Sequence, residues 1–413
     1  MKLTIAVAGV LLSTVLFAAL EPLAPTGGVV VSLVPDAQKK VMDLQTLSER
    51  IRLLQDGRKS VGALNRGGHW RVSKPLVIEV RATEGEKGPW KVEIGKSADL
   101  ADARTWYVPA PGTDDLTGRS VASCVTQNVV KITMSMANLE IATRYYWRVS
   151  YRGYCGFGCH AKHGCKVCEN RMESPIASFV TEDLAPRWIA VEGEVGNIRD
   201  LGGRVGRDGR RVRQGLVYRG EAFNDNSVNG EVQGRSRLTI GDVRYLTGTL
   251  GIKTDLDLRG IGETADMVAS PLGENVKLVQ HSSFGYQRIF EPEGMEMMAK
   301  NFRVFCDRKN YPVYFHCIAG ADRTGSLAYV LNGVLGVSRQ ELETDWESTF
   351  YPNIPDENPD PNLARRESHF NDGFAKYGDA DTPWNERIVL YLKACGITDA
   401  EIEMFRDIML SPK

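Results

Sequence analysis

The sequence carries almost no net charge. Its 51 Lys and Arg residues are balanced by 52 Asp and Glu residues, which leaves a formal charge of −1 at pH 7. Proteins that bind nucleic acids or anionic membranes through their overall field usually have an excess of positive charge. The composition therefore predicts no nucleic-acid partner. The 413 residues, of which 42% are hydrophobic and 25% charged, suit two or three domains with separate cores.

The N-terminal apolar run, residues 3–20, contains no charged residue and follows a Met-Lys start. This order is the pattern of a secretory signal peptide. No cysteine comes directly after the run, which argues against a lipoprotein. The run is long for a signal and short for a membrane span, and Ala18 and Ala19 define a cleavage site poorly. We predict that residues 1–20 export the protein to the periplasm or the medium. An uncleaved anchor is the alternative, and only then would the membrane be a partner.

Residues 21–72 are predicted to form a short helical lead-in with no chemistry of its own. Within residues 36–56, apolar side chains recur at helical spacing on roughly one face. They are Val41, Leu44, Leu47, Ile51 and Leu54.

Residues 73–183 change to short strands, which predicts an all-β sandwich. Segments of strand character are 76–80, 90–94, 105–108 and 129–134. The run Leu-Glu-Ile-Ala-Thr-Arg-Tyr-Tyr-Trp-Arg-Val at 139–149 resembles the Leu…Thr-x-Tyr-x-x-Arg-Val strand of fibronectin type III domains. The resemblance implies that Tyr145 packs at a strand corner and caps it. We expect a spacer or docking module, because no catalytic constellation lies in this segment.

A cysteine-rich loop interrupts this domain. It contains Cys155, Cys159, Cys165 and Cys168, with His160 and His163 between them. In the cytosol such spacing suggests zinc. In an exported protein it more often forms two disulfides that staple a long loop. We predict disulfides, with zinc as the alternative, and Cys124 could join either arrangement.

The residues that carry chemistry lie at 316–325, which read His-Cys-Ile-Ala-Gly-Ala-Asp-Arg-Thr-Gly. A β-branched and aromatic run at 312–315 predicts a buried strand before them, and apolar residues at helical spacing predict a helix after them. Backbone N–H groups of such a loop, together with the positive end of the helix, form a cradle for an oxyanion.

Each residue type in this loop suits phosphoryl transfer. A thiolate at Cys317 is a nucleophile toward phosphorus and needs no metal or other cofactor. The planar fork of Arg323 can hold two phosphoryl oxygens. Gly320 and Gly325 permit unusual backbone angles and close approach. Thr324 can donate a hydrogen bond to the sulfur. The predicted reaction is phosphoryl transfer to cysteine followed by hydrolysis of a phosphorylated protein or another phosphomonoester.

The loop resembles the signature HC-x-x-G-x-DRTG of the bacterial branch of the cysteine-dependent protein tyrosine phosphatase superfamily. Two further segments resemble that branch. They are Asn-Ile-Arg-Asp-Leu-Gly-Gly at 197–203, followed by Leu-Val-Tyr-Arg-Gly at 216–220, and Gly-Ile-Lys-Thr-Asp-Leu-Asp-Leu-Arg at 251–259 with Glu263. The resemblance covers roughly residues 188–413. It implies an α/β protein tyrosine phosphatase-like catalytic domain over residues 186–413, preceded by the fibronectin type III-like sandwich.

The resemblance also implies a set of site residues. The catalytic residues would be Cys317, Arg323 and Asp322. Asp322 would protonate the leaving group; the alternative is that it only orients Arg323. The substrate-binding residues would be Ile318, Ala319, Gly320, Ala321, Thr324, Gly325, Arg199 and Asp200, with no metal. His316 is expected to support Cys317 through hydrogen bonding, and Arg259 to form an internal ion pair with Glu263.

Alternatives for the function share the same loop. Many relatives have Lys where this chain has Ala321, and that cation would favour polyanionic substrates such as phosphoinositides. Its absence favours phosphotyrosine, while a phosphoinositide or inositol-phosphate phosphatase and a catalytically dead phosphate-binding module remain alternatives. Six arginines between residues 204 and 219 are interpreted as a solvated hairpin, with a substrate-facing surface as the alternative. The sequence gives no indication of the oligomeric state.

Overall fold

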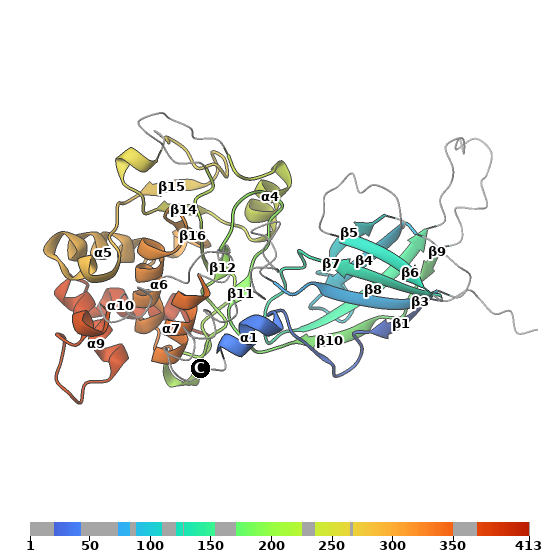
Figure 1. Cartoon of the computed structure of the whole chain (residues 1–413), viewed down its shortest axis with the longest axis horizontal. Helices are drawn as coiled ribbons and strands as arrows, with labels where there is room; N and C mark the ends of the chain where they lie inside the picture. The colour runs from blue at the N-terminus through green and yellow to red at the C-terminus, as the bar shows by residue number, and fades with distance from the viewer. Residues whose placement is uncertain are drawn as a thin grey trace, which may run out of the picture.

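The computed structural model describes residues 20–42, 73–82, 88–109, 121–126, 128–152, 171–224, 236–264, 267–349 and 370–412. These residues form two units, a strand-rich N-terminal unit and a C-terminal α/β unit (Figure 1). Within these ranges, no helix has both the length and the apolar character needed to cross a membrane. The apolar run before Leu20 and the cluster from Cys155 to Cys168 lie outside the described residues.

The N-terminal unit consists of two sheets that share one core. The strands are β1 (Leu20–Ala24), β2 (Val30–Val31), β3 (Leu76–Ala82), β4 (Trp90–Gly95), β5 (Arg104–Val108), β6 (Val121–Thr126), β7 (Val129–Met134), β8 (Arg144–Arg152), β9 (Arg171–Glu173) and β10 (Ala177–Thr181). One sheet has the order β1-β3-β7-β6 and the other β2-β10-β8-β4-β5, with β9 paired to β8. Alternate residues of β3 and β4, such as Ile78 and Val92, are buried in the same cluster. This period of two is what packs two sheets face to face.

The predicted helical lead-in differs from the structure. Within residues 21–72, helix α1 covers only Asp36–Met42, while β1 pairs with β3 and β2 pairs with β10. Two short strands therefore extend the sheets of the N-terminal unit. Their pairing partners lie far away in the sequence, and neither strand shows the alternating pattern that would have marked it.

The contact implied for Tyr145 is present. The backbone N–H of Glu140 donates to the Tyr145 hydroxyl oxygen at 2.9 Å, and the Tyr145 ring stacks on Phe179 at 5.8 Å between centroids. The tyrosine therefore fixes the turn that leads into β8.

The C-terminal unit contains a six-stranded sheet with the order β11-β12-β13-β16-β14-β15. Its strands are β11 (Arg187–Trp188), β12 (Arg199–Asp200), β13 (Val217–Gly220), β14 (Thr254–Asp257), β15 (Lys277–Gln280) and β16 (Val313–His316). β13, β16, β14 and β15 run parallel, and β11 and β12 add an antiparallel edge.

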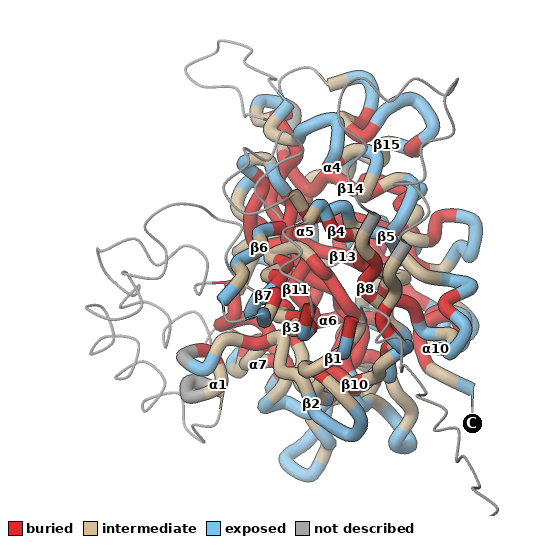
Figure 2. The backbone as a smooth tube through the Cα atoms, turned by 90° about the vertical axis from the view of Figure 1, so that its right-hand side faces the viewer, coloured by how far each residue is buried: buried red, intermediate tan, exposed pale blue. Residues whose placement is uncertain are grey.

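Helices cover both faces of this sheet. They are α4 (Ile240–Arg244), continued by a π-helical turn at Tyr245–Thr249, α5 (Pro292–Val304), α6 (Asp322–Val334), α7 (Arg339–Ser348), α9 (Trp384–Ala394) and α10 (Asp399–Met409). Figure 1 shows α5, α6, α7, α9 and α10 on one side and α4 on the other. Accordingly Val313 and Phe315 belong to one core cluster and Tyr314 to another. The central strands are buried on both faces, as Figure 2 shows in red.

The two units are joined by hydrogen bonds through several segments. Asn138 and Ala190 exchange two bonds, from Asn138 Nδ2 to the Ala190 carbonyl at 2.9 Å and from Ala190 N to Asn138 Oδ1 at 2.8 Å. The Ile141 backbone likewise exchanges two bonds with the Gln214 side chain, at 2.9 and 3.1 Å. Buried amide pairs of this kind hold the sandwich against β11 and the turn before β13.

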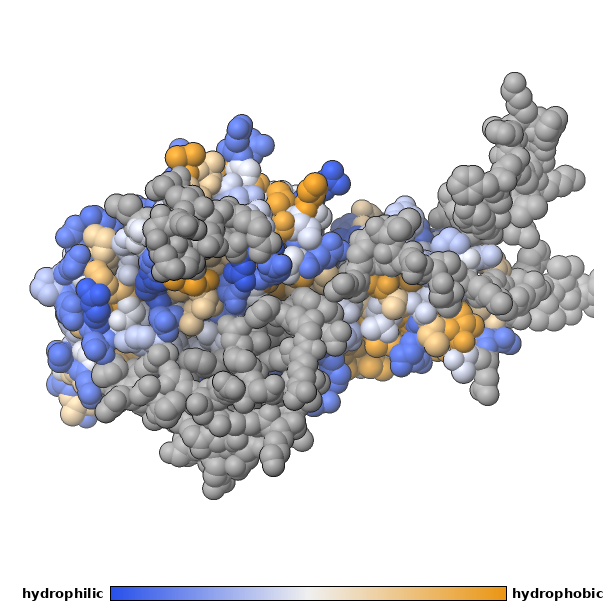
Figure 3. All heavy atoms as spheres, turned by 45° about the horizontal axis from the view of Figure 1, so that its top comes forward, coloured by the Kyte–Doolittle hydropathy of each residue, from blue (hydrophilic) through white to orange (hydrophobic). Residues whose placement is uncertain are grey.

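Large exposed hydrophobic side chains come from both units. They are Val29, Val30, Tyr107, Ile176, Val205, Ile240, Val268, Ile318 and Met404. Figure 3 shows apolar and hydrophilic residues intermixed on one face of the C-terminal unit. Ile318 directly follows Cys317, so one of these apolar side chains stands at the predicted reaction centre.

Candidate active site

The predicted oxyanion loop connects β16 to α6. β16 lies in the middle of the parallel strands, and the loop leaves from its carboxyl end, where α/β proteins usually bind ligands. Cys317 is the first residue after the strand and is 3% exposed. Asp322 begins α6, so the positive end of this 13-residue helix points into the loop. The strand–loop–helix arrangement predicted from the sequence is present.

Three carbonyl groups of the loop are bonded to the surrounding scaffold. The pairs are Ile318 O with Ala222 N at 3.0 Å, Ala319 O with Asn197 Nδ2 at 3.0 Å, and Gly320 O with Arg219 Nη2 at 2.8 Å. Across a trans peptide, the carbonyl of one residue and the N–H of the next point in opposite directions. The N–H groups of Ala319, Gly320 and Ala321 therefore point away from the scaffold, toward the space the loop encloses. Such an array is an anion cradle.

Gly320 is required by this geometry. Its φ is +65°, and a Cβ atom built on it would clash with the carbonyl oxygen of Gly220. Gly325 is also confined, since a Cβ there would lie 2.9 Å from Cδ1 of Trp346 on α7. Both glycines predicted for the loop therefore stand where a side chain does not fit.

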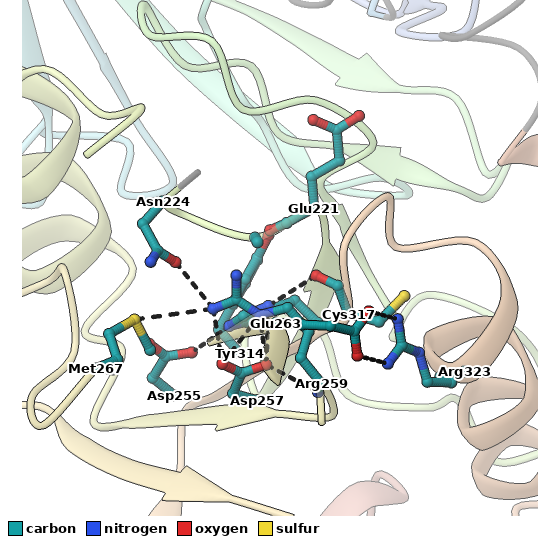
Figure 4. Close-up of polar contacts among 12 residues, drawn as sticks. Glu221, Asn224, Asp255, Asp257, Arg259, Glu263, Met267, Tyr314, Cys317 and Arg323 are labelled. Atoms are coloured by element: carbon teal, nitrogen blue, oxygen red, sulfur yellow. Dashed lines mark hydrogen bonds and ion pairs between the residues drawn. The ribbon is translucent and has the colours of Figure 1, made fainter. Parts of the chain in front are cut away.

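Arg323 is held in place by Glu263. Their side chains form a two-pronged ion pair, with Nη1–Oε2 at 2.6 Å and Nη2–Oε1 at 2.9 Å, beside the Cys317 sulfur (Figure 4). Burial lowers the pKa of Arg323, but its bond to Glu263 and the negative charge of Cys317 raise it overall. The predicted Arg259–Glu263 pair is wrong in its partner, because Arg259 binds Asp257, with Nη2–Oδ2 at 2.7 Å, as well as Asn224.

His316 supports the loop from within the sheet. Its Nδ1 lies 3.0 Å from the Cys317 carbonyl oxygen, and its Nε2 lies 3.1 Å from Oδ1 of Asp255. Burial lowers the pKa of His316, but Asp257 and Asp255 outweigh that effect and raise it overall. The support predicted for His316 is made to the backbone of the cysteine.

Asp322 and Thr324 occupy the start of α6 in different ways. The carboxylate of Asp322 accepts a hydrogen bond from the hydroxyl of Tyr286 and is half-exposed. The hydroxyl of Thr324 is buried and has no hydrogen-bond partner among the described residues. The bond predicted from Thr324 to the cysteine sulfur is therefore not formed in this conformation.

Arg199 lies beneath the loop instead of lining it. Its side chain is fully buried and donates to Asp345, from Nε at 3.0 Å, and to Asn197 Oδ1. Asn197 in turn binds the Ala319 carbonyl. The sequence predicts that Arg199 binds substrate, but in the structure Arg199 contacts Asn197, and Asn197 contacts the loop. Arg199 therefore positions Asn197.

The same carboxylate binds two further arginines. Asp345 Oδ1 pairs with Arg204 at 2.9 Å, and its Oδ2 pairs with Arg219 at 2.7 Å. Both arginines belong to the basic run that the sequence analysis assigned to a solvated hairpin. They are buried because β13 and the segment before it carry them under the loop. Burial lowers the pKa of Arg199 and the charge of Arg219 lowers it further, to about 9, although Asp345 raises it.

Asp200 does not reach the loop. Its carboxylate is fully buried and accepts hydrogen bonds from Arg187 at 3.0 Å, Gly202 N at 2.8 Å and Gly215 N at 2.7 Å. These partners fix the turn between β12 and β13 next to the N-terminal unit. The prediction that Asp200 lines the substrate site is therefore not matched by its position.

The structure adds residues whose roles the sequence analysis did not assign. Asn197 and Arg219 lie in segments 197–203 and 216–220, which carry the family resemblance. The sequence therefore points to these two residues but not to their contacts with the loop. Asp345 and Tyr286 lie in α7 and in the 3₁₀ turn Tyr286–Phe290, outside every motif. A buried acidic residue needs a cationic partner, but the burial of Asp345 is visible only in the structure.

Comparisons with known proteins identify the family of the C-terminal part of the chain. Residues 190–411, more than half of the chain, match the sequence family described as "Tyrosine phosphatase family". A protein of Cupriavidus necator named "Putative tyrosine-protein phosphatase" is 29% identical, over 40% of this chain and 67% of its own length. The crystal structure of the core catalytic domain of PP-IP phosphatase SIW14 from S. cerevisiae matches 38% of this chain and 88% of its own, with 16% identity and a TM-score of 0.23. By the family match, the chain belongs to the tyrosine phosphatase family.

Proposed function

We propose that the protein hydrolyses phosphomonoesters, with phosphotyrosine as the preferred class, through a phosphocysteine intermediate on Cys317. The observation that carries the proposal is the loop itself. Three carbonyls bonded outward leave their N–H groups facing the enclosed space above a buried cysteine. This array suits the equatorial oxygens of a phosphoryl group, and backbone donors fixed in advance stabilise the transition state without reorganisation.

The reaction would run in two displacements. In the first, the Cys317 thiolate attacks phosphorus, an S–P bond forms, the P–O bond to the leaving group breaks, and the leaving oxygen takes a proton from Asp322. In the second, water attacks phosphorus while Asp322 accepts a proton from it, the S–P bond breaks, and phosphate and the thiolate are regenerated. The bond from the Tyr286 hydroxyl would hold the carboxyl group of Asp322 in position for both steps.

Arg323 would bind the phosphoryl oxygens while the carboxylate of Glu263 holds the Arg323 guanidinium in a fixed orientation. A guanidinium has five N–H donors, and two of them serve Glu263. The remaining donors, next to the sulfur, are available to the phosphoryl group. Glu263 therefore acts as a positioning residue.

Phosphotyrosine is favoured over polyphosphorylated substrates for two reasons. Ile318, 37% exposed beside Cys317, offers an apolar surface to an aromatic ring. Ala321, which directly precedes α6, offers no cation to a second phosphate. A phosphoinositide or inositol-phosphate substrate is the second outcome of the test below.

We also propose three features that rest on the sequence. Residues 1–20 support export, with anchoring over residues 3–20 as the alternative. The strand pattern and Tyr145 support a fibronectin type III-like spacer or docking module. In an exported protein, the four cysteines from Cys155 to Cys168 would form two disulfides, which a free-thiol titration combined with zinc analysis would test.

The experiment compares Cys317→Ser with Cys306→Ser. Cys306 is half-buried, and its pKa is raised to about 12 by burial, so it is a matched cysteine without a proposed role. Wild type and Cys306→Ser should hydrolyse p-nitrophenyl phosphate in the presence of EDTA, and Cys317→Ser should not. Phosphotyrosyl peptides should be cleaved faster than phosphoseryl peptides, phosphoinositides and inositol phosphates. Turnover by Cys317→Ser would refute the covalent mechanism, and a preference for inositides would replace the substrate class.

A further inference from the structure

A cavity of about 310 Å³ lies where the two units meet. Its wall comes from β4, β5 and the segment before β8 in the N-terminal unit, and from β11, β13 and the π-helical turn after α4 in the C-terminal unit. The lining includes Arg104, Tyr145, Arg187, Tyr218, Tyr245 and Leu250. None of the lining residues belongs to the loop at 316–325. The volume falls in the range of small-ligand pockets.

Two guanidinium groups face this cavity from opposite units. Arg187 is 6% exposed and donates to Asp200 and to the carbonyls of Asn138 and Leu139. Arg104 donates from Nη1 to the Ala137 carbonyl at 2.9 Å, and no carboxylate among the described residues lies within ion-pair distance of it.

Two aromatic rings lie next to the guanidinium of Arg104. Its guanidinium carbon lies 4.5 Å from the centre of the Trp106 ring and 5.2 Å from that of Tyr245. These contacts fix the plane of the guanidinium but leave its charge without a counter-ion. A guanidinium held in plane by stacking loses little further freedom when it binds an oxyanion.

The carboxylates at the rim are already engaged. Asp102 accepts from the backbone N–H groups of Lys96 and Ser97, at 3.0 and 2.8 Å. Glu140 pairs with the Lys96 side chain at 3.0 Å. Neither carboxylate lies within ion-pair distance of Arg104, and Asp200 forms its ion pair with Arg187. Burial lowers the pKa of Arg104, the nearby charge of Arg187 lowers it further, the interaction with the Tyr245 hydroxyl group raises it, and the net shift is downward.

We propose that this cavity binds a small organic oxyanion, whose carboxylate or phosphoryl group lies between Arg104 and Arg187 and whose apolar body packs against Tyr245 and Leu250. Both arginines have N–H donors left over for such a group, and an anion there removes the repulsion between two cations from different units. The occupied site bridges the sandwich and the catalytic unit. The proposal does not depend on turnover at Cys317.

The test measures binding of two probes to the full chain in chloride buffer without phosphate, by calorimetry and by thermal unfolding. Benzoate represents the carboxylate source and phenylphosphonate the phosphoryl source. We expect saturable binding of at least one probe at millimolar concentration, with a rise in the unfolding temperature, because a ligand that binds only the folded protein stabilises it. Failure of both probes to bind would overturn the proposal.

Variants assign the binding to the cavity. Arg104→Gln removes the unpaired charge, and Thr249→Trp fills the cavity from an exposed position on its wall without touching a charge. Arg104→Gln should weaken probe binding about tenfold or more, as expected for the loss of one charge-assisted contact. Thr249→Trp should weaken it at least as much, because the indole ring takes the space that the probe needs. Arg81→Gln, on an exposed arginine of the same unit that pairs with Glu21, should leave the affinity unchanged.

The phosphatase loop is the competing anion site, and Arg323→Ala separates it. Binding that survives Arg323→Ala and is lost in both cavity variants supports the proposal. Binding that is lost in Arg323→Ala and unchanged in both cavity variants places the probes in the loop and refutes it. Both cavity variants should retain turnover of p-nitrophenyl phosphate, which shows that they fold.

Discussion

Replacing Asp345 with Asn should destabilise the catalytic unit severely. Asp345 is 2.7–3.0 Å from three guanidiniums, those of Arg199, Arg204 and Arg219, and all four side chains are at most 4% exposed. Asn keeps the shape but removes the charge, which leaves three buried cations packed together without their shared counter-ion. Removing one partner of a buried ion pair costs about 3–5 kcal/mol. We expect Asp345→Asn to lower the free energy of unfolding by at least about 3 kcal/mol.

The loss should depend on pH in a defined direction. Burial raises the pKa of Asp345, but the three arginines outweigh it and hold the pKa well below its usual range. Because the folded pKa is depressed, the ion pairs stabilise the protein fully above the unfolded pKa of about 3.9, and this stabilisation is lost as pH falls toward the folded value. The difference between wild type and Asp345→Asn should therefore be largest near neutral pH and shrink in acid.

Urea unfolding followed by tryptophan fluorescence and by loss of p-nitrophenyl phosphate turnover measures the effect, since turnover reports on the catalytic unit alone. The matched control is Glu403→Gln, which removes an exposed carboxylate that pairs with Arg406 at 2.6 Å. Surface pairs of this kind contribute little, so the control should unfold like wild type. If Asp345→Asn unfolds at the same urea concentration as Glu403→Gln, the buried cluster does not stabilise the fold as argued.

Three further substitutions test the site. Glu263→Gln should reduce turnover of p-nitrophenyl phosphate by about tenfold or more with unchanged unfolding, because Arg323 loses its anionic partner; full activity would show that Arg323 needs no such support. Asp322→Asn should slow phosphotyrosine far more than activated aryl phosphates, and equal losses would restrict Asp322 to an orienting role. For His316 the pKa is raised, so its ion pairs stabilise below about pH 6.5 and the stabilisation is lost as pH rises through the folded pKa. His316→Gln should abolish that pH dependence of stability between pH 6 and 9, and an unchanged slope would assign it elsewhere.

Local patterns predicted the elements that position the loop. Apolar spacing gave the strand before Cys317 and the helix after it, and the structure has them as β16 and α6. Apolar spacing interrupted by a glycine likewise predicts two helices across residues 384–410, and Gly396, with a φ of +85°, separates α9 from α10. Such features could be predicted because the period of side chains along a strand or helix is a property of neighbouring residues.

Partners across the fold could not be predicted in the same way. Glu263 was assigned to Arg259, four residues away, but binds Arg323, 60 residues away. The basic run around Arg219 predicts a solvated hairpin, but Arg219 is buried and pairs with Asp345, 126 residues away. Choice of an ion-pair partner depends on which strands lie next to each other, and β13 lies beside β16 although 92 residues separate their ends. Spacing along the chain contains no information on that adjacency.

The buried arginine cluster links the stability of this fold to its proposed ligand. Three guanidiniums share one carboxylate beneath the loop, so this buried cluster holds an excess of positive charge. Burying three cations with one anion is costly by itself, because charges removed from water need full compensation. Arg219 donates to the Gly320 carbonyl at 2.8 Å and so brings its positive charge next to the loop. A phosphoryl group bound in the loop would add negative charge beside this cluster. The contacts that turn the loop carbonyls outward therefore also place cations around the loop. One set of residues thus provides both the geometry and the positive potential that favour anion binding.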